Sequence, residues 1–252
     1  MVGDGGKEKG AGTSRVALVT GAARGIGFEV CRVLARDGMT VLLGARDAEK
    51  ASVAAAELAG DGLDVRPTTV DVSRDESVRR LAAELEAEFA RLDVLVNNAA
   101  VYVDWSETAA GADLQAAHEV LETNLFGAWR ACQALLPLIR KSAHGRIVNV
   151  SSGAGSHGDQ QFGLTTNRGS AASYGISKAA LNALTAKLAA ELEGRGILVN
   201  AVCPGLTATA PGMEAMGARP VPEGAASVAW AATLPDDGPT GGFFRDGKPL
   251  PW

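Results

Sequence analysis

The sequence predicts the α/β class, as a single doubly wound parallel sheet with helices on both faces. Short runs rich in β-branched residues alternate with stretches of helical pattern, and this order repeats along most of the chain. The strand-like runs are almost continuously apolar, which is typical of parallel strands that helices cover on both sides. A glycine-rich turn lies between the first strand and the first helix.

Each expected element has a local signal. We expect strands at residues 15–20, 40–45, 63–72, 92–99, 145–152 and 197–205, and helices at residues 25–38, 48–60, 75–90, 113–142 and 170–192. Gly38 is a plausible stop for the first helix. Because no linker or repeat divides the chain, we expect one domain over residues 14–252, preceded by a polar, glycine-rich, disordered leader at residues 1–13.

Composition narrows the classes of function. The chain has 252 residues, is 46% hydrophobic and carries a formal net charge of −5, with no basic stripe, so nucleic acid is not an expected partner. No apolar run reaches membrane-spanning length, so no membrane is expected either. The cysteines, Cys31, Cys132 and Cys203, are widely spaced and lie in apolar contexts. That pattern predicts neither disulfides nor a metal site, but reduced core thiols in a cytoplasmic protein.

The turn "TGAARGIG" is a candidate anion site. Thr20, Gly21, Gly25 and Gly27 follow a strand and open a helix. Glycines allow the backbone to approach a ligand closely, and the helix N-terminus directs unpaired N–H groups at it, so a pyrophosphate would fit. The alternative is that the glycines serve only the strand-to-helix turn.

The end of the second strand bears on the choice of cofactor. An acidic residue there would bind the ribose hydroxyls of NAD, but Ala45 and Arg46 occupy this place. Arg24 lies in the glycine turn and can reach the same region. Paired guanidiniums suit a 2′-phosphate, which favours NADP(H) over NAD(H). The alternative is that both are ordinary surface arginines.

Tyr174 and Lys178 lie four positions apart on an apolar helix, so their side chains share one face. An ammonium beside a phenol is expected to lower the phenol's pKa and prepare it for proton transfer. Without further support, a buried aromatic residue and a solvated lysine would explain the pair equally well.

Several motifs together resemble the short-chain dehydrogenase/reductase family, which has a Rossmann fold. They are "TGAARGIG" (20–27), "NNAA" (97–100), Asn124 in "ETNLFG", "VSS" (150–152), "YGISK" (174–178) and "PG" (204–205). The resemblance implies reversible hydride transfer between a nicotinamide and a carbonyl or alcohol carbon of a small-molecule substrate. It implies the catalytic residues Asn124, Ser152, Tyr174 and Lys178. It implies cofactor contacts from Thr20, Gly21, Arg24, Gly25, Ile26, Gly27, Arg46, Asp71, Val72, Asn98, Ala99, Ala100, Tyr174, Lys178, Pro204, Gly205 and Thr207.

The resemblance also implies a role for each catalytic residue. Tyr174 would exchange the proton, Lys178 would bind the nicotinamide ribose, and Ser152 would bind the carbonyl oxygen. Asn124 would hold a water that links Lys178 to solvent. Ser151 and Ser152 are adjacent, and strand alternation directs only one of them to the site. Ser152 is our choice, with Ser151 left open.

Two departures from the common family pattern resemble its carbonyl-reductase branch, which prefers NADPH. The stretch from Ser152 to Tyr174 is longer than usual, and the chain ends in "GPTGGFFRDGKPLPW". The extra residues are polar, so we expect a loop on the pocket rim that affects substrate choice and leaves a homodimer or homotetramer open. Pocket lining or ordinary loop packing would each explain Tyr102, Trp105, Gln161, Phe162 and Met213. Alternative functions are a nucleotide-sugar epimerase or dehydratase, and a nicotinamide-binding regulator without activity.

Overall fold

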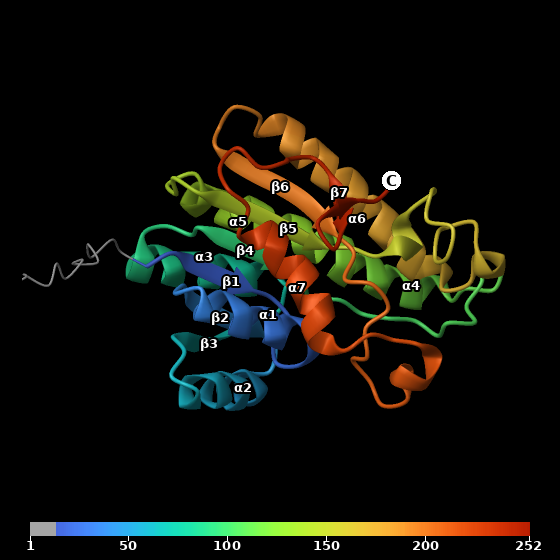
Figure 1. The fold of residues 1–252 in the computed structure, drawn as a ribbon, viewed down its shortest axis with the longest axis horizontal. Coiled ribbons are helices and arrows are strands. Elements are labelled where there is room, and N and C mark those ends of the chain that lie inside the picture. The colour runs from blue at the N-terminus through green and yellow to red at the C-terminus, as the bar shows by residue number, and fades with distance from the viewer. Residues whose placement is uncertain (1–13) are drawn as a thin grey trace, which may run out of the picture.

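A single sheet runs through the middle of the molecule (Figure 1). In the computed structural model, which describes residues 14–252, its strands are ordered β3-β2-β1-β4-β5-β6-β7-β8. All neighbours pair in parallel except β7 and β8, which form an antiparallel hairpin. The strands are β1 (Val16–Val19), β2 (Thr40–Ala45), β3 (Val65–Thr69), β4 (Val94–Asn97), β5 (Gly145–Val150), β6 (Ile197–Val202), β7 (Phe243–Arg245) and β8 (Lys248–Pro249).

Helices cover both faces of the sheet, as predicted. One apolar cluster joins the sheet to α1 (Gly25–Arg36), α2 (Ala48–Gly60) and α7 (Val221–Ala232). The opposite cluster joins it to α3 (Asp75–Phe89), α5 (Ala128–Ile139) and α6 (Ala172–Glu191). Alternate side chains of one strand enter opposite clusters: Ala17 and Val19 enter the first, and Val16 and Leu18 the second. This doubly wound arrangement confirms the predicted fold class.

Several predicted boundaries were wrong. The strand expected at 63–72 is confined to Val65–Thr69, since β3 is an edge strand whose residues are mostly exposed. The strand expected at 92–99 covers Val94–Asn97, because the following residues turn into the ligand edge. The expected helix at 113–142 is α4 (Leu114–Leu121), a π-helical segment η1 (Glu122–Gly127) and α5. Helix α7 and the β7–β8 hairpin were not predicted, because their signals are short and rich in Ala or Gly.

Four further outcomes concern the start of α6, the inserted segment, the leader and membrane-spanning helices. Helix α6 begins at Ala172, after Ala171 adopts a positive φ of 50°. The inserted segment, residues 156–171, follows a short 3-10 turn at Gly153–Gly155, contains a second one at Asn167–Gly169 and is otherwise irregular. The leader expected at residues 1–13 lies outside the described residues. Among residues 14–252, the helices are too short or too polar to cross a bilayer.

Candidate active site

The glycine turn between β1 and α1 is closely packed. Gly21 and Gly25 have positive φ angles of 64° and 62°. A Cβ on Gly21 would lie 2.6 Å from the Cα of Ala99, so that position has no room for a side chain. Helix α1 has no side-chain cap and no acidic residue in its first turn. Its free N–H groups therefore face the turn, as a phosphate site requires.

Thr20 and Asn98 join the ends of β1 and β4. The Thr20 hydroxyl oxygen accepts hydrogen bonds from the main-chain N–H groups of Asn98 and Ala99, each at 3.1 Å. The Asn98 side-chain amide donates to the Thr20 and Gly21 carbonyls, at 2.9 and 3.1 Å. These bonds hold the glycine turn against the "NNAA" segment. Thr20 itself is buried and supports the turn from behind.

A cavity of about 560 Å³ opens along this edge of the sheet. Its lining includes these predicted cofactor residues: Gly21, Arg24, Gly25, Ile26, Gly27, Arg46, Asp71, Val72, Asn98, Ala99 and Ala100. It also includes residues not predicted as cofactor contacts: Ala23, Ala45, Asp47, Lys50, Val70, Ser73, Val101, Tyr102, Thr123 and Thr209. Most of the additions adjoin a predicted residue, and Lys50 lies on the first turn of the helix after Arg46. A cradle of close-packed glycines with nearby cations fits a dinucleotide.

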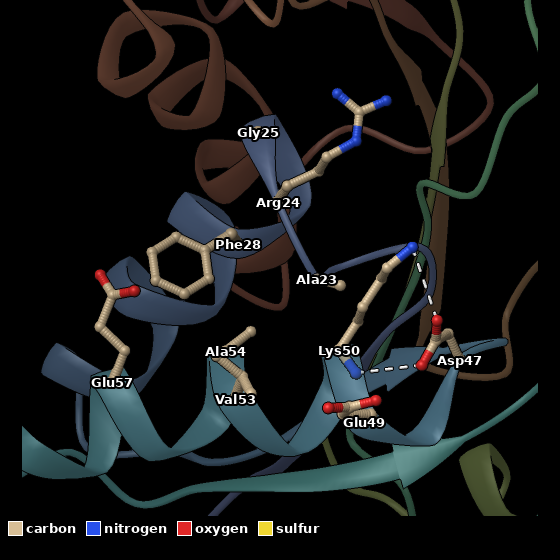
Figure 2. A pocket seen from close by; sticks show the side chains of 10 residues that line it. All are labelled: Ala23, Arg24, Gly25, Phe28, Asp47, Glu49, Lys50, Val53, Ala54 and Glu57. Carbon is tan, nitrogen blue, oxygen red and sulfur yellow. Dashed lines mark hydrogen bonds and ion pairs between the residues drawn. The ribbon is translucent and has the colours of Figure 1, made fainter.

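A second hollow, of about 620 Å³, lies between α1 and α2 (Figure 2). It shares Arg24, Asp47 and Lys50 with the first cavity. The Lys50 ammonium lies 3.5 Å from the Asp47 carboxylate, and the Lys50 side chain is 74% exposed. Arg24, Arg46 and Lys50 thus place positive charges at one end of the cofactor cavity. Helical spacing from Asp47 was the sequence signal that would have found Lys50.

Tyr174 and Lys178 lie together on α6 at the ligand edge, and both are buried. The Lys178 ammonium is 5.6 Å from the centre of the Tyr174 ring and donates a 2.8 Å hydrogen bond to the Val150 carbonyl. Burial lowers the pKa of Lys178 to about 8, although the charge of Cys203 opposes this. The pair therefore shares a face, as the spacing predicted.

The structure contradicts the expected effect of Lys178 on the pKa of the Tyr174 phenol. Burial raises the pKa of Tyr174 well above its usual value, and the charge of Tyr102 adds to this, while hydrogen bonding with Ser152 opposes it. The expectation of a lowered pKa for Tyr174 was wrong. Desolvation is the largest influence on this pKa. The Lys178 ammonium lies 5.6 Å from the centre of the Tyr174 ring and donates its hydrogen bond to the Val150 carbonyl.

Neighbouring serines have different surroundings. The Ser151 hydroxyl is buried and donates to the side-chain oxygen of Asn182 on α6 at 2.6 Å, so it points toward α6. Ser152 is half-buried and accepts a 3.2 Å hydrogen bond from the Ala154 N–H, and it lies close enough to Tyr174 to influence the pKa of the phenol. Of the two hydroxyls, Ser152 therefore has the geometry to meet a ligand beside Tyr174.

Asn124 occupies the π-helical segment η1. Its side chain accepts a hydrogen bond from the Val101 N–H at 2.8 Å and donates to the Val101 carbonyl at 3.0 Å. Its amide also donates to the Ser177 hydroxyl at 3.0 Å. A π-turn widens a helix locally and is frequent at functional sites. Here it lets Asn124 bind the strand-end segment and α6 at once.

Two aromatic rings pack against Tyr174. The Tyr102 ring is stacked on the Tyr174 ring at 5.1 Å, and the Trp105 ring meets Tyr174 edge-on at 6.1 Å. Tyr102 lines the cofactor cavity. Six of the residues predicted as cofactor contacts do not line it: Thr20, Tyr174, Lys178, Pro204, Gly205 and Thr207. Thr207 is buried, and its hydroxyl donates to the Pro204 carbonyl at 3.1 Å.

Comparison with known proteins accounts for this arrangement. Residues 15–217 match the family model described as short chain dehydrogenase. The chain belongs to the short-chain dehydrogenase family. Like other members of that family, it carries a doubly wound sheet with the glycine turn, the "YGISK" helix and the serine strand at one edge.

Relatives of the short-chain dehydrogenase family align over nearly the whole chain. Short-chain dehydrogenase/reductase 1 of Saponaria officinalis is 34% identical, covering 94% of this chain and 96% of the relative. Carbonyl reductase (NADPH) 1 of Mus musculus is 36% identical, covering 94% and 98%. The crystal structure of NADPH-bound carbonyl reductase from chicken fatty liver superposes with a TM-score of 0.83 at 28% identity, covering 95% of this chain and 99% of that chain.

Proposed function

We propose that this protein is an NADPH-dependent oxidoreductase that reduces a ketone or aldehyde to an alcohol. Its relatives include proteins named as NADPH carbonyl reductases. The observation that carries the proposal is the placement of the buried Tyr174 and Lys178 together on α6, against the Tyr102 ring that lines the cavity fitting a dinucleotide.

The reaction needs a hydride, a proton and a place for the carbonyl oxygen. NADPH supplies the hydride to the carbonyl carbon when it is bound. Ser152 and Tyr174 donate hydrogen bonds to the carbonyl oxygen, which stabilises the negative charge that develops on it. Tyr174 then gives its proton to that oxygen, completing the alcohol. In alcohol oxidation the same steps run in reverse.

Lys178 and Asn124 serve this proton exchange. Lys178 would bind the nicotinamide ribose hydroxyls, and its charge would stabilise the phenolate form of Tyr174. Asn124 lies between the Val101 segment and α6, where it would hold a water on the proton path from Lys178 to solvent. The raised pKa of Tyr174 favours the protonated phenol, which is the form that reduction consumes.

Tyr174→Phe tests the mechanism. The variant keeps the ring and its stacking on Tyr102 but loses the proton donor. We expect kcat for ketone reduction to fall by ~100-fold or more, as measured by NADPH consumption over a panel of ketones, aldehydes and quinones. The affinity for NADPH should stay within about twofold of the wild type. A variant with wild-type turnover would refute the assignment. A wild-type protein that binds NADPH but reduces none of the panel would favour a regulator.

Charge at the adenosine end selects the cofactor. Arg24, Arg46 and Lys50 provide positive charge for a 2′-phosphate, which NADPH carries and NADH lacks. We expect Arg46→Ala to weaken NADPH about tenfold or more, because each charge-assisted contact contributes ~1.5–3 kcal/mol. NADH affinity should hardly change. Arg36→Ala, an exposed arginine at the far end of α1, is the control. Preference of the wild type for NADH would contradict this assignment.

Assembly and location complete the proposal. The exposed apolar side chains Phe126 and Trp129, 44% and 41% exposed, lie on η1 and α5 and supply a surface for a homodimer, with a homotetramer as the alternative. The cysteines Cys31, Cys132 and Cys203 are buried and free, which suits a reducing cytoplasm.

A further inference from the structure

The inserted segment is tied to the last strands by a buried ion pair. Asp159 lies in this segment, and its carboxylate is 2.6 Å from the Arg245 guanidinium at the end of β7. The Asp159 side chain is 4% exposed and that of Arg245 is 24% exposed. The other oxygen of Asp159 accepts hydrogen bonds from the Gln161 and Phe162 N–H groups, each at 2.9 Å. One carboxylate therefore both shapes the loop and anchors it.

Arg245 connects this anchor to the turn at Ser152–Gly155, which we call the serine turn. Its guanidinium contacts the Cys203 sulfur, at 3.2 Å from Nη2 and 3.4 Å from Nε. The same sulfur accepts a 3.2 Å hydrogen bond from the N–H of Gly153, the residue after Ser152. A Cβ on Gly153 would lie 2.7 Å from Arg245 Nη2, so the ion pair presses directly against this turn.

The serine turn also contacts the catalytic helix. A Cβ on Gly155 would lie 2.5 Å from the carbonyl carbon of Lys178, so the turn packs on the α6 backbone without space to spare. A displacement of residues 153–155 would therefore shift Ser152 relative to Tyr174. Such displacements matter, because misplacing aligned groups by about 1 Å can cost ~100-fold in rate.

The end of the chain fixes the same segment from the other side. The Ser156 hydroxyl donates to the Pro251 carbonyl at 2.6 Å, and the His157 N–H donates to the Trp252 main-chain oxygen at 2.9 Å. The Trp252 ring is stacked on Phe243 of β7 at 5.7 Å. The terminus lies beside β7 (Figure 1). The inserted segment is thus held by β7 and the residues that follow it.

We propose that Asp159 and Arg245 are positioning residues for substrate binding. Their ion pair holds the inserted segment against the Ser152–Gly155 turn, and so sets the position of the Ser152 hydroxyl and the shape of the pocket rim. This inference rests on the proposed carbonyl reduction. The pair does not contact the cofactor cavity, so its loss should change substrate handling and leave NADPH binding intact.

Asp159→Asn tests the proposal with a matched control. The amide keeps the size of the side chain and an oxygen for the Gln161 and Phe162 N–H groups but removes the charge facing Arg245. The control is Asp93→Asn, because the Arg91–Asp93 pair has similar burial, 27% and 4% exposed, and lies at the opposite ends of the strands. We expect both variants to lower Tm, since each breaks a buried pair.

The kinetics should separate the two variants. For Asp159→Asn we expect kcat/KM for ketones to fall about tenfold, through kcat as well as KM because Ser152 stabilises the developing negative charge. We also expect a changed order of preference among the panel and an NADPH affinity within about twofold. For Asp93→Asn we expect wild-type KM and preference. Arg245→Lys, which keeps the charge, should recover part of the loss seen in Arg245→Gln. Unchanged ketone kinetics in Asp159→Asn, or an equal KM change in Asp93→Asn, would overturn the proposal.

Hydrogen exchange gives a readout that needs no turnover. Amides of residues 156–166 should exchange faster in Asp159→Asn than in Asp93→Asn, because only the first variant releases the segment. Equal exchange in the two variants would overturn the inference even if the kinetics differed. A wild type that reduces no ketone would refute the proposed function, while the exchange result would still decide the anchor.

Discussion

At the scale of single residues, burial governs the chemistry of the catalytic pair. Tyr174 and Lys178 are 6% and 2% exposed, and both lose the hydration that would favour their charged forms. Lys178 has a pKa lowered to about 8 by burial, and Tyr174 has a pKa raised by burial. The phenol therefore keeps its proton near neutral pH, and the Lys178 ammonium loses its proton at a lower pH than an exposed lysine does.

The shift of Lys178 predicts how stability depends on pH. Its folded pKa of about 8 lies below the usual lysine value of ~10.4. Between these values the unfolded chain binds a proton that the folded chain does not, so this group's contribution to stability rises with pH across that window. Below about pH 8 the folded state carries the full cost of a buried charge.

We expect Lys178→Met to raise Tm relative to wild type near neutral pH, without cofactor. The gain should shrink toward zero near pH 10.4, where lysine is neutral in both states. The groups facing Lys178 are Tyr174 and Cys203, and both remain in the variant, so the Tm difference isolates Lys178. Thermal unfolding of both proteins at several pH values measures it. A difference independent of pH would show that the lysine is not destabilised by burial.

At the scale of elements, the turn between β1 and α1 limits what the edge of the sheet can accept. Gly21 has a positive φ and no room for a Cβ against Ala99. Gly38 also has a positive φ, of 82°, but nothing lies within 4 Å of its would-be Cβ. Comparing substitutions at the two glycines therefore separates the cost of backbone strain from the cost of a steric clash.

We expect Gly21→Ala to destabilise the protein by more than Gly38→Ala. A positive φ costs ~1–3 kcal/mol for a non-glycine residue, which both variants bear. Gly21→Ala must in addition move β1 away from the Ala99 backbone. It should weaken NADPH binding more than tenfold, whereas Gly38→Ala should leave binding unchanged. Chemical denaturation and NADPH titration measure the two effects. Equal stability losses would show that the Ala99 contact relaxes freely.

At the scale of the whole molecule, the layers leave an apolar surface on one side. Trp129 of α5 and Phe126 of η1 are exposed although large and apolar, and Ile176 of α6 is 50% exposed. A second copy of the chain would bury such side chains, at roughly 25 cal/mol per Å² of apolar surface. The inserted segment precedes α6 and does not cover Trp129, which remains exposed.

We expect the wild type to run as a dimer or tetramer in light scattering and Trp129→Glu to shift it toward monomer. Val53→Glu, at an exposed apolar residue on α2, is the control and should keep the wild-type mass. Both substitutions add the same charge at an exposed position, so only the surface differs. A wild type that is monomeric at micromolar concentration would contradict the proposed assembly.

Much of the architecture was predictable from local pattern. The alternation of apolar strands and helices determined the parallel sheet and its covered faces, because side-chain period and burial follow directly from neighbouring residues. Local pattern also identified the glycine turn, the position of Arg46 and the spacing of Tyr174 and Lys178. Helix α7 and the β7–β8 hairpin were not, since their short runs gain order only by packing on β6 and α1.

Other properties of the site were decided only by tertiary structure. The direction of the Tyr174 pKa depends on burial that no spacing of four residues reports. The separate surroundings of Ser151 and Ser152 depend on where Asn182 and Tyr174 lie. Asp159 and Arg245 are far apart in the sequence and meet only because β7 joins the sheet beside β6. Local sequence specifies periodicity and turn chemistry, whereas desolvation and long-range charge pairing arise only when distant segments pack together.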